Sequence, residues 1–475
     1  MEVIEGIITC TKNTSNKKYV FVGIKDKKLI LRELSNTHDL KNGDYVSINE
    51  KYEIIKKITS DKKTEEKLLD IYSIAEKILD HKKEYTTSIK EIKKILSSMS
   101  QSFLNSSKLL IKKLITGSPI IVRFHNDADG SSGAYALFLA INELIKLFDI
   151  QYKPHITWSM QKTVSYGIED SMADLYITSQ YSSLEKPLLL ITDFGTSKQS
   201  NGGVEKVLEK FDIIWLEHHP IEEGFNYKKI INYINPWLFG GDSNITAGFL
   251  SCIFAYYLSG LELAELENAS MIGDYSIYAD LKKSGAELSA FLDMVTSDPR
   301  IISSVSNNLT PAEIAAVLND KERYASLLSS AKIKMEESIH AAMDKIRQYK
   351  SKTLLIYVSD FSLSRNRESR YPLPGRFSSK LLDYLSSKNT LPCVLILYFG
   401  FYISIRVDKK IAEKLDILKI ITTIKSEHED DVEAGGGHIS AASMKVSEGA
   451  DKKEYIKLIV NMIKEKDNGE AQNSS

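Results

Sequence analysis

Over the first sixty residues of the chain, apolar positions fall in short runs that alternate with polar ones. The runs Tyr19–Gly23, Leu29–Leu31 and Asp44–Ile48 are rich in β-branched and aromatic residues, and Asn, Gly and Lys separate them. This pattern predicts short strands joined by turns. We therefore expect a small β domain over residues 1–60.

One turn in this region indicates which kind of β domain to expect. The stretch Leu40–Val46 contains a Gly-Asp pair that resembles the turn common in small OB-like barrels. Barrels of this class often bind nucleic acid. Because no aromatic stripe for base stacking accompanies the turn, a structural or partner-docking role for this OB-like domain stays open.

From about Thr64 to Ile115 the apolar period becomes helical. Apolar residues recur at intervals of three and four positions while lysines fill the opposite face, which is typical of an amphipathic helix. We expect a helical connector over residues 61–117.

Beyond the connector, short apolar runs alternate with helix-like segments. Pro119–Phe124, Leu188–Thr192 and Ile213–Leu216 have the composition of buried strands, and their alternation with helices predicts a parallel sheet covered on both faces. The fold class is therefore α/β, with one domain over 118–280. Within it, Ser243–Leu261 carries no charge, but its Asn, Thr and Gly breaks favour a buried helix over a membrane span.

The remaining residues predict a helical linker over 281–350 and a second, smaller α/β unit over 351–466. A disordered tail is expected over 467–475. The elements expected in the second unit are a strand at Thr353–Val358, a helix at Phe377–Ser387, a hairpin of Cys393–Phe399 with Phe401–Val407, a strand at Ala441–Val446 and a helix at Lys453–Lys464.

Charge and cysteine content limit the class of protein. The chain has 62 Lys and Arg against 63 Asp and Glu, a net charge of −1, which excludes a globally basic, histone-like binder but not a local basic groove. Only ten basic residues are Arg, and five of them fall between 365 and 406, where planar guanidinium groups can bind phosphate. The three cysteines form no C-x-x-C pair and the N-terminus has no basic or apolar leader, so we expect a reducing, cytoplasmic location without disulfides.

Acidic and imidazole side chains follow the predicted strands of the first α/β domain. They are His125, Asp127 and Asp129 after the first strand, Asp193 after the second, Glu217, His218 and His219 after the third, and Asp274 at the end of a helix-like stretch. Ligands of such sheets gather at the carboxyl ends of strands. Each residue taken singly has an ordinary structural role as a cap or turn residue, but three of the nine histidines lie in these short motifs, and a fourth, His438, follows a run of glycines near the C-terminus.

Clustered carboxylates would repel one another unless a cation neutralised them. Mixed carboxylate and imidazole ligands suit Mn²⁺, Mg²⁺ or Zn²⁺, and enough ligands are present for two ions. Two closely spaced ions form a clamp for phosphoryl transfer, which activates water and stabilises the charge on phosphate.

Five motifs in order resemble the signature of a known family. His125-x-Asp127-x-Asp129-Gly130, Asp193-x-Gly195, Glu217-His218-His219-Pro220 and Gly273-Asp274 resemble the motifs of the DHH phosphoesterase superfamily. Gly435-Gly436-Gly437-His438, followed by Ala441 and Ala442, resembles the DHH-associated C-terminal domain. Within the superfamily the chain is most similar to the archaeal RecJ-like nucleases, relatives of the GINS-associated nuclease and of a nuclease-like subunit of the eukaryotic replicative helicase.

The resemblance implies a phosphodiesterase that uses two Mn²⁺ or Mg²⁺ ions to trim single-stranded nucleic acid. It assigns metal binding to His125, Asp127, Asp129, Asp193, His218 and Asp274, with Asp193 as the bridge between the two ions. It implies that His219 contacts the scissile phosphate. Arg406, Gly436, Gly437 and His438 would hold the substrate phosphate from the second domain, where a glycine-rich backbone admits close approach of N–H groups to an anion.

Two positions depart from the family pattern. Glu217 stands where the family motif begins with Asp, and Ser443 stands where a glycine is expected. If the Glu217 carboxylate does not bind the metal but orients His218, the longer side chain either is tolerated or loosens the site. If Glu217 is a direct ligand, its extra methylene group would shift the metal.

The sequence therefore predicts a metal-dependent exonuclease that releases nucleotides from single-stranded DNA or RNA during replication or repair. One alternative is a replication-complex scaffold that binds GINS and the helicase, with nuclease activity weakened or lost through Glu217. Another alternative is a phosphodiesterase of short oligonucleotides.

Overall fold

The computed structural model describes residues 4–13, 18–24, 28–34, 40–49, 53–58, 84–148, 150, 154–303, 308–364 and 370–469. The chain divides into two compact units, Met1–Tyr324 and Ala325–Ser475, and each is described by itself. The division falls inside the predicted linker 281–350. Residues 61–83 of the predicted connector lie outside the described residues.

The N-terminal strands form an antiparallel sheet in the order β3-β2-β1-β4-β5. Its small core contains Ile8, Val20, Val22, Val46 and Ile48. The strands are β1 (Ile4–Asn13), β2 (Lys18–Ile24), β3 (Lys28–Leu34), β4 (Tyr45–Ile48) and β5 (Ile54–Ile58). The predicted β domain is confirmed as an antiparallel sheet, although among the described residues β3 and β5 are not paired with one another.

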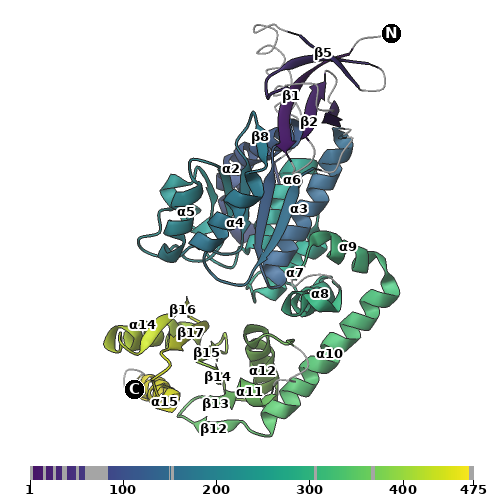
Figure 1. Ribbon diagram of the computed structural model, residues 1–475. Coiled ribbons are helices and arrows are strands. Elements are labelled where there is room, and N and C mark those ends of the chain that lie inside the picture. The colour runs from purple at the N-terminus through teal and green to yellow at the C-terminus, as the bar shows by residue number, and fades with distance from the viewer. Residues whose placement is uncertain are drawn as a thin grey trace. The chain divides into compact units, whose positions relative to one another are not determined.

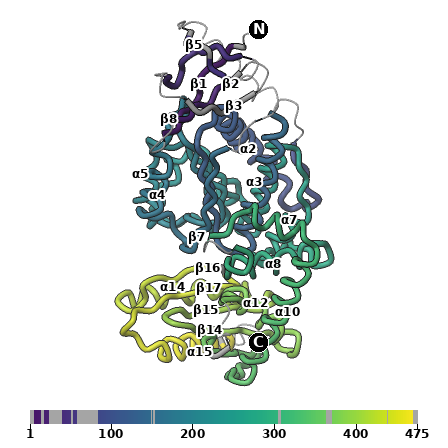
Figure 2. The backbone as a smooth tube through the Cα atoms, turned by 45° about the vertical axis from the view of Figure 1, so that its right-hand side comes forward, coloured from purple at the N-terminus to yellow at the C-terminus, as the bar shows by residue number. Residues whose placement is uncertain are grey.

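A strand from the following domain extends this sheet. In Figures 1 and 2, β8 (Tyr181–Ser183) lies beside β1, and the two strands pair antiparallel through Cys10↔Ser183 and Lys12↔Tyr181. The ring of His155 lies between Phe21 and Tyr181, with centroid separations of 5.4 and 4.8 Å. Main-chain pairing and aromatic packing thus attach the N-terminal sheet to the α/β domain.

This junction predicts an acid-sensitive stability. Burial first, and the charge of Lys12 second, lower the pKa of His155 to about 4. Because the unfolded imidazole takes up a proton near pH 6.5, the contribution of His155 to stability is present above that pH and is lost between pH 6.5 and 4. Thermal unfolding at pH 7.5 and 5 should show a smaller difference in His155→Phe than in the native protein. The exposed His340→Gln variant is the control, and an unchanged pH dependence in His155→Phe would contradict this reading.

The α/β domain of the first unit contains a five-stranded sheet in the order β11-β10-β9-β6-β7. All its pairs are parallel, and its apolar strands are buried. The strands are β6 (Ile120–His125), β7 (Ile156–Gln161), β9 (Leu188–Thr192), β10 (Asp212–Leu216) and β11 (Asn232–Ile234). The predicted parallel sheet is confirmed, with β7 and β11 added at its edges.

Helices cover both faces of this sheet (Figure 1). On one face, Val204 and Val207 of α5 and Leu175 of α4 pack in one core with Leu189, Ile191 and Trp215 of the sheet. On the other face lie α3 and α6, with α2 packed against α6. The helices are α2 (Lys90–Thr116), α3 (Ala128–Leu147), α4 (Ile168–Thr178), η1 (Lys198–Ser200), α5 (Asn201–Val207), η2 (Tyr227–Lys229), η3 (Pro236–Phe239) and α6 (Ala247–Ser259).

Helix α6 is the segment whose charge-free sequence raised the question of a membrane span. Eleven of its 13 residues are buried against the sheet and neighbouring helices, so its apolar composition has a structural cause. The helices of the described part of the chain are each too short or too polar to traverse a bilayer.

Further helices follow this sheet along the chain. They are α7 (Ala264–Gly273), α8 (Ala286–Ser297), η4 (Pro299–Ile301), α9 (Pro311–Asn319) and α10 (Lys321–Met343). The predicted linker 281–350 is helical over most of its length, but its last residues form strand β12 (Arg347–Lys350). The prediction of helix was wrong there, because β12 is specified by its antiparallel pairing with β13.

The second unit contains one sheet in the order β12-β13-β14-β15-β17-β16. On one of its faces, Ile403, Ile405 and Met444 form a core with α14 and α15. The elements are β13 (Leu355–Asp360), α11 (Phe361–Ser364), α12 (Pro374–Lys388), β14 (Cys393–Phe399), β15 (Tyr402–Val407), α13 (Ala412–Leu415), α14 (Ile417–Glu427), β16 (Val432–His438), β17 (Ala441–Val446) and α15 (Lys452–Gly469).

Two predictions for this unit need correction. No strand was predicted for the glycine run, but it forms strand β16, since it pairs with β17 through Gly436↔Ser443 and His438↔Ala441. The predicted disordered tail begins too early, because α15 continues to Gly469 and Asp467 accepts a hydrogen bond from the main chain of Thr353 at 2.9 Å. Residues 470–475 lie outside the described residues.

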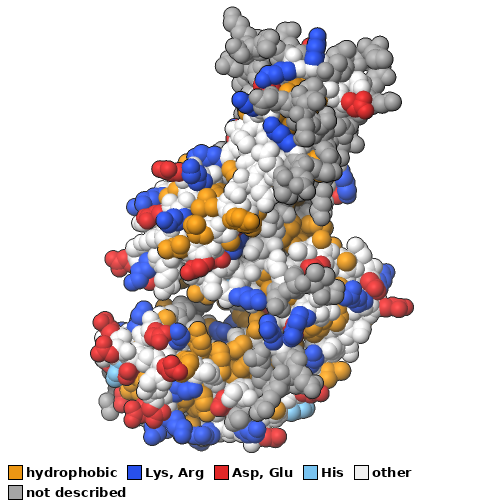
Figure 3. Space-filling model, viewed as in Figure 1, with side chains coloured by type: hydrophobic (Ala, Val, Ile, Leu, Met, Phe, Trp, Pro, Cys, Tyr) orange, Lys and Arg blue, Asp and Glu red, His pale blue; other side chains and the backbone are white. Residues whose placement is uncertain are grey.

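Surface charge follows the near-neutral composition. On the face seen in Figure 3, basic and acidic side chains are intermixed over both units. Of the basic residues singled out above, Arg365 and Arg367 lie outside the described residues. Arg123 is buried in β6 and forms ion pairs with Asp174 at 2.8 Å and Asp170 at 3.0 Å, which gives it a structural role.

Candidate metal centre

The predicted residues of the first unit gather at one edge of the parallel sheet. Strand β6 has β7 on one side and β9 on the other, so the chain reverses its direction of winding between β6 and β9. Ligands of parallel sheets bind at such a switch point, outside the carboxyl ends of the strands. Asp127 and Asp129 follow β6, Asp193 follows β9, and Glu217 begins the segment after β10.

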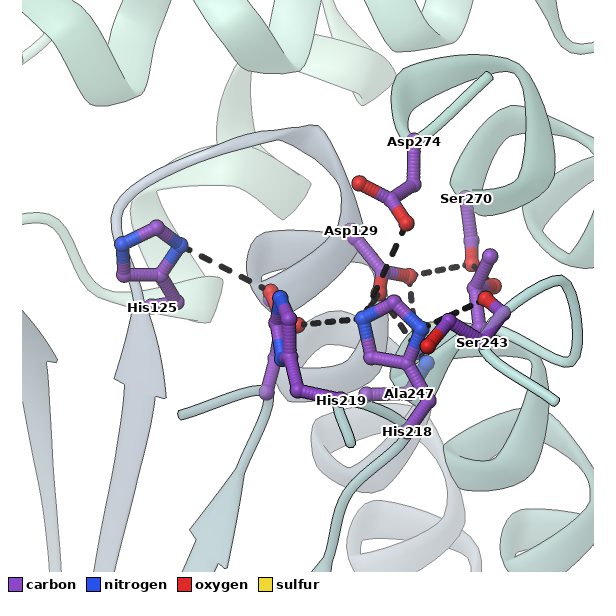
Figure 4. A network of polar contacts seen from close by, with 12 residues as sticks. His125, Asp129, His218, His219, Ser243, Ala247, Ser270 and Asp274 are labelled. Atoms are coloured by element: carbon purple, nitrogen blue, oxygen red, sulfur yellow. Dashed lines mark hydrogen bonds and ion pairs between the residues drawn. The ribbon is translucent and has the colours of Figure 1, made fainter. Parts of the chain in front are cut away.

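The ring of His218 presents its Nε2 atom to this cluster. Its Nδ1 donates a hydrogen bond to the carbonyl of Ser243 at 2.7 Å, so in the neutral imidazole the lone pair is on Nε2. Figure 4 shows the ring between Ser243 and the acidic side chains. Nε2 lies 3.2 Å from Asp193 Oδ1, 3.6 Å from Asp129 Oδ2 and 3.7 Å from Asp274 Oδ2. In the described part of the chain this buried nitrogen has no hydrogen-bond partner.

Asp193 is the most constrained of the acidic residues. Its φ of 70° lies in the left-handed region, which a non-glycine residue adopts at an energetic cost. The side chain is buried, and among the described residues its Oδ2 has no hydrogen-bond partner. Burial, together with the charges of Asp127, Asp129 and nearby acids, raises the pKa of Asp193 well above the ordinary carboxyl range. A cation next to this buried carboxylate would stabilise its ionised form.

Asp127 caps helix α3 and contacts His125. Its Oδ1 accepts a hydrogen bond from the Gly130 main chain at 2.9 Å, and its Oδ2 accepts one from His125 Nδ1 at 2.6 Å. His125 Nδ1 also lies 3.7 Å from Asp193 Oδ2. Gly130 lies in the first turn of α3. A Cβ there would approach the His125 carbonyl to 2.5 Å, so glycine permits the close contact of helix and strand.

Asp129 is held by the N-terminus of α6. Its two carboxylate oxygens accept hydrogen bonds from the Ala247 and Gly248 main chains at 3.0 and 2.8 Å, and Ser270 donates a third. A Cβ at position 248 would lie 2.6 Å from the Asp129 carbonyl, so the residue there must be glycine. The helix dipole and these donors stabilise the anion.

Asp274 completes the set from a different element. It follows α7 directly. Burial raises the pKa of Asp274 to about 6, opposed by His218 and reinforced by the charge of Asp129. Like Asp193, it is a carboxylate that a nearby cation would keep ionised.

Glu217 contacts His219 rather than the ring of His218. Its carboxylate accepts hydrogen bonds from the main chain of both histidines and from His219 Nδ1, the last at 3.0 Å. Burial alone would raise the pKa of Glu217, but the charge and hydrogen bonds of His219 lower it to about 2. In turn the Glu217 carboxylate overcomes the effect of burial and raises the pKa of His219 to about 9. The ring of His218 is oriented by Ser243 instead.

The donor set fits divalent cations. Two groups of three residues have ligand atoms within 4.8 Å of one another, Asp193 with His218 and His219, and Asp193 with His125 and Asp127. Asp193 is common to both groups. Neighbouring ligands of a small divalent cation lie about 3 Å apart, close to the 3.2 Å between His218 Nε2 and Asp193 Oδ1. The unpartnered lone pair of His218 and the excess of buried carboxylates are the features that a cation would satisfy.

The predicted phosphate-binding residues lie in the second unit, in adjacent strands. Arg406 of β15 pairs across the sheet with Ala441 of β17, and Ala441 pairs with His438 of β16. Gly436 pairs with Ser443, two rows away from the pair of His438 and Ala441, and a Cβ at 436 would meet open space. Gly437 has a φ of 138°. Arg406 Nε donates to Ser378 Oγ at 3.1 Å, so α12 supports the guanidinium.

Comparisons with known proteins bear on the fold. No family model matches the chain. The uncharacterized protein MJ1198 of Methanocaldococcus jannaschii is 22% identical over 484 residues, covering 89% of this chain and 63% of that protein. The chain thus spans less than two thirds of the length of this relative. A solved structure described as the DHH domain of a member of a ribosomal protein family matches with a TM-score of 0.70 at 18% identity, over 85% of this chain and 99% of its own.

The chain has the fold of a DHH-domain protein. A more distant match is RecJ from Thermus thermophilus in complex with Mn²⁺, with a TM-score of 0.46 at 14% identity over 76% of this chain and 55% of that one. The resemblance inferred from the five motifs is confirmed for the fold, whereas the roles of individual residues remain predictions.

Several residues that build the centre of this DHH fold were not predicted. Ser243 orients His218, Ser270 holds Asp129, and Asn235 and Trp237 bind the main-chain carbonyls of the two histidines. The contacts of Ser243, Asn235 and Trp237 involve main-chain carbonyls, which leave no signal in the sequence, and Ser270 lies 141 residues from Asp129. The one available signal is Asn235-Pro236 directly after an apolar run, which is typical of a helix start.

Proposed function

We propose that this chain is a divalent-cation-dependent phosphodiesterase that removes nucleotides from the end of single-stranded DNA or RNA. The observation that carries the proposal is the buried lone pair of His218 Nε2, aimed at Asp129, Asp193 and Asp274. A site with this much uncompensated negative charge at the switch point of a parallel sheet suits cations and a phosphate substrate.

The residues have separate tasks in this proposal. His218, Asp129, Asp193 and Asp274 would hold one Mn²⁺ or Mg²⁺ ion, and His125, Asp127 and Asp193 a second, with Asp193 shared. Bound divalent cations supply charge stabilisation for the phosphate and lower the pKa of a coordinated water, so no protein nucleophile is needed. Main-chain hydrogen bonds to Asp127 and Asp129 hold these carboxylates in position before substrate binds.

His219 would contact the scissile phosphate. Its Nδ1 is occupied by Glu217, and its side chain is 40% exposed. With a pKa near 9, the ring is protonated at neutral pH and its Nε2–H is a donor without a lone pair for a metal. It can therefore donate a charge-assisted hydrogen bond to a phosphate oxygen.

The second unit would hold the substrate strand. Arg406, His438 and the main chain of Gly436 and Gly437 lie in neighbouring strands, and β16 is an edge strand with one side free of a strand partner in the described sheet. Guanidinium and edge N–H groups suit phosphate. Exonuclease action in replication or repair, and any contact with GINS or a helicase, are part of the proposal.

The scaffold alternative makes a different expectation of the site. In a binding subunit without catalytic activity, buried carboxylates would destabilise the fold in the absence of a cation and would serve no function. Here five acidic side chains gather around His218 and His219, and Glu217 lies behind His219 rather than among the atoms around His218 Nε2. The geometry therefore favours the enzyme.

The Asp127→Asn variant tests the proposal with the fold preserved. Asparagine caps a helix as well as aspartate does, so α3 should remain intact while one anionic ligand is lost. With Mn²⁺ and end-labelled DNA or RNA single strands, the native protein should release nucleotides, and the variant should be slower by about 100-fold or more. A native protein that leaves long strands intact but cleaves dinucleotides would support the short-oligonucleotide alternative instead. A native protein inactive on both would contradict the proposal.

A further inference from the structure

Trp237 stands beside the metal centre with its ring uncovered. The indole is 43% exposed, yet its Nε1–H donates hydrogen bonds to the His218 carbonyl at 3.0 Å and to Ser243 Oγ at 3.2 Å. The carbonyl of the same Ser243 accepts the hydrogen bond from the ring of His218. The polar edge of the indole is thus fully engaged, while much of its apolar surface faces outward.

The segment that carries Trp237 is held in place from both sides. Asn235 Oδ1 accepts the Trp237 main-chain N–H at 3.0 Å and caps η3, and Asn235 Nδ2 donates to the His219 carbonyl at 3.0 Å. Gly240 ends η3 with a φ of 78°. A Cβ at Gly241 would lie 2.9 Å from Pro236 Cβ. The ring is therefore oriented before any ligand binds, so little conformational freedom remains to be lost on binding.

The indole ring lies close to the residue that is proposed to contact the scissile phosphate. The indole edge touches the main chain of His218, while His219 is the residue proposed to meet the scissile phosphate. The indole Nε1 lies 3.0 Å from the carbonyl of His218, the residue directly before His219, so the base of a nucleotide whose phosphate meets His219 is within reach of the ring. Aromatic rings bind any base by stacking, because every base has a π-face.

We propose that Trp237 is a nucleobase-stacking platform that positions the nucleotide next to the scissile phosphate. This inference rests on the proposed function and adds a subsite for a base to it. Stacking of one base on such a ring corresponds to about a 10- to 100-fold gain in affinity. The platform accepts all four bases and requires an unpaired strand, since a base inside a duplex is not free to stack on it.

Two substitutions separate the platform from the support that the indole N–H gives to His218. Trp237→Phe loses the N–H but keeps an aromatic face, whereas Trp237→Leu loses both. Loss of the N–H should lower kcat similarly in both variants. Only Trp237→Leu should also raise KM, by about 10- to 100-fold, on a single strand with normal bases. The neighbouring Leu238 is comparably exposed, at 41%, and Leu238→Ala is the matched control.

A substrate without bases tests whether the effect of Trp237 on KM depends on base stacking. Native protein, Trp237→Phe, Trp237→Leu and Leu238→Ala are assayed with Mn²⁺ on a normal strand and on one whose last two nucleotides lack bases. The platform predicts that the KM difference between native and Trp237→Leu disappears on the abasic strand. An equal KM difference on both strands would overturn it, because a structural role does not depend on the base. Failure of the proposed function itself would appear separately, as native protein inactive on both strands and on bis(p-nitrophenyl) phosphate.

Discussion

Asp193→Asn is expected to reduce Mn²⁺-dependent hydrolysis of a single strand by about 1,000-fold or more. Asp193 belongs to both groups of candidate ligands, so a single substitution impairs both cation sites. Asparagine has the same shape and fits the same φ of 70°, since Asn adopts the left-handed region more readily than most residues. The loss should therefore arise from the missing charge rather than from unfolding.

The same substitution should raise the melting temperature of the metal-free protein. In the chelated native protein the pKa of Asp193 is raised, first by burial and then by neighbouring carboxylates, so ionisation of this group at neutral pH opposes folding. A neutral amide removes that cost. Thermal unfolding with a chelator measures the effect, and Asp430→Asn, at an exposed position, controls for the change in net charge. A lower melting temperature together with unchanged hydrolysis would refute the assignment.

Glu217→Asp is expected to lower kcat by about 10- to 100-fold while leaving Mn²⁺ affinity nearly unchanged. Aspartate is shorter by one methylene, about 1.5 Å, and its carboxylate no longer reaches His219 Nδ1, which now lies 3.0 Å from Glu217. The His219 ring then loses both its orientation and the anion that keeps it protonated. Calorimetric binding of Mn²⁺ and steady-state kinetics separate the two effects.

The scaffold alternative predicts the opposite result for this substitution. If Glu217 had silenced the enzyme, the native protein would be inactive and the aspartate variant would gain activity. A Glu217→Gln variant serves as the matched control, because it keeps the length of the side chain but not its charge. A gain in turnover in Glu217→Asp would show that the observed contact with His219 is not the productive arrangement.

The centre could be predicted from sequence because its ligands follow strands. His125, Asp127 and Asp193 stand directly after apolar runs, and parallel strands bring their carboxyl ends to one edge of a sheet. The dipeptide His218-His219 contributed two imidazoles from a third strand. Adjacent residues on one strand end point in different directions, and so the two histidines face different partners.

Other parts of the fold could not be predicted because their partners are distant in sequence. Strand β8 has three residues and exists through pairing with β1, some 170 residues earlier. The glycines of β16 have low strand propensity, and their strand is imposed by β17. Helix α14 was also missing from the predicted elements, but here a signal was present in the sequence. Its apolar residues Ile417, Ile420, Ile421 and Ile424 have helical spacing.

The central claim is that the buried carboxylates and His218 form a site for two divalent cations. Isothermal titration of the metal-free protein with Mn²⁺ tests it most directly. We expect two ions bound per chain in the native protein and a loss of at least one in Asp193→Asn. Absence of Mn²⁺ binding in the native protein, or unchanged stoichiometry and affinity in the variant, would contradict it.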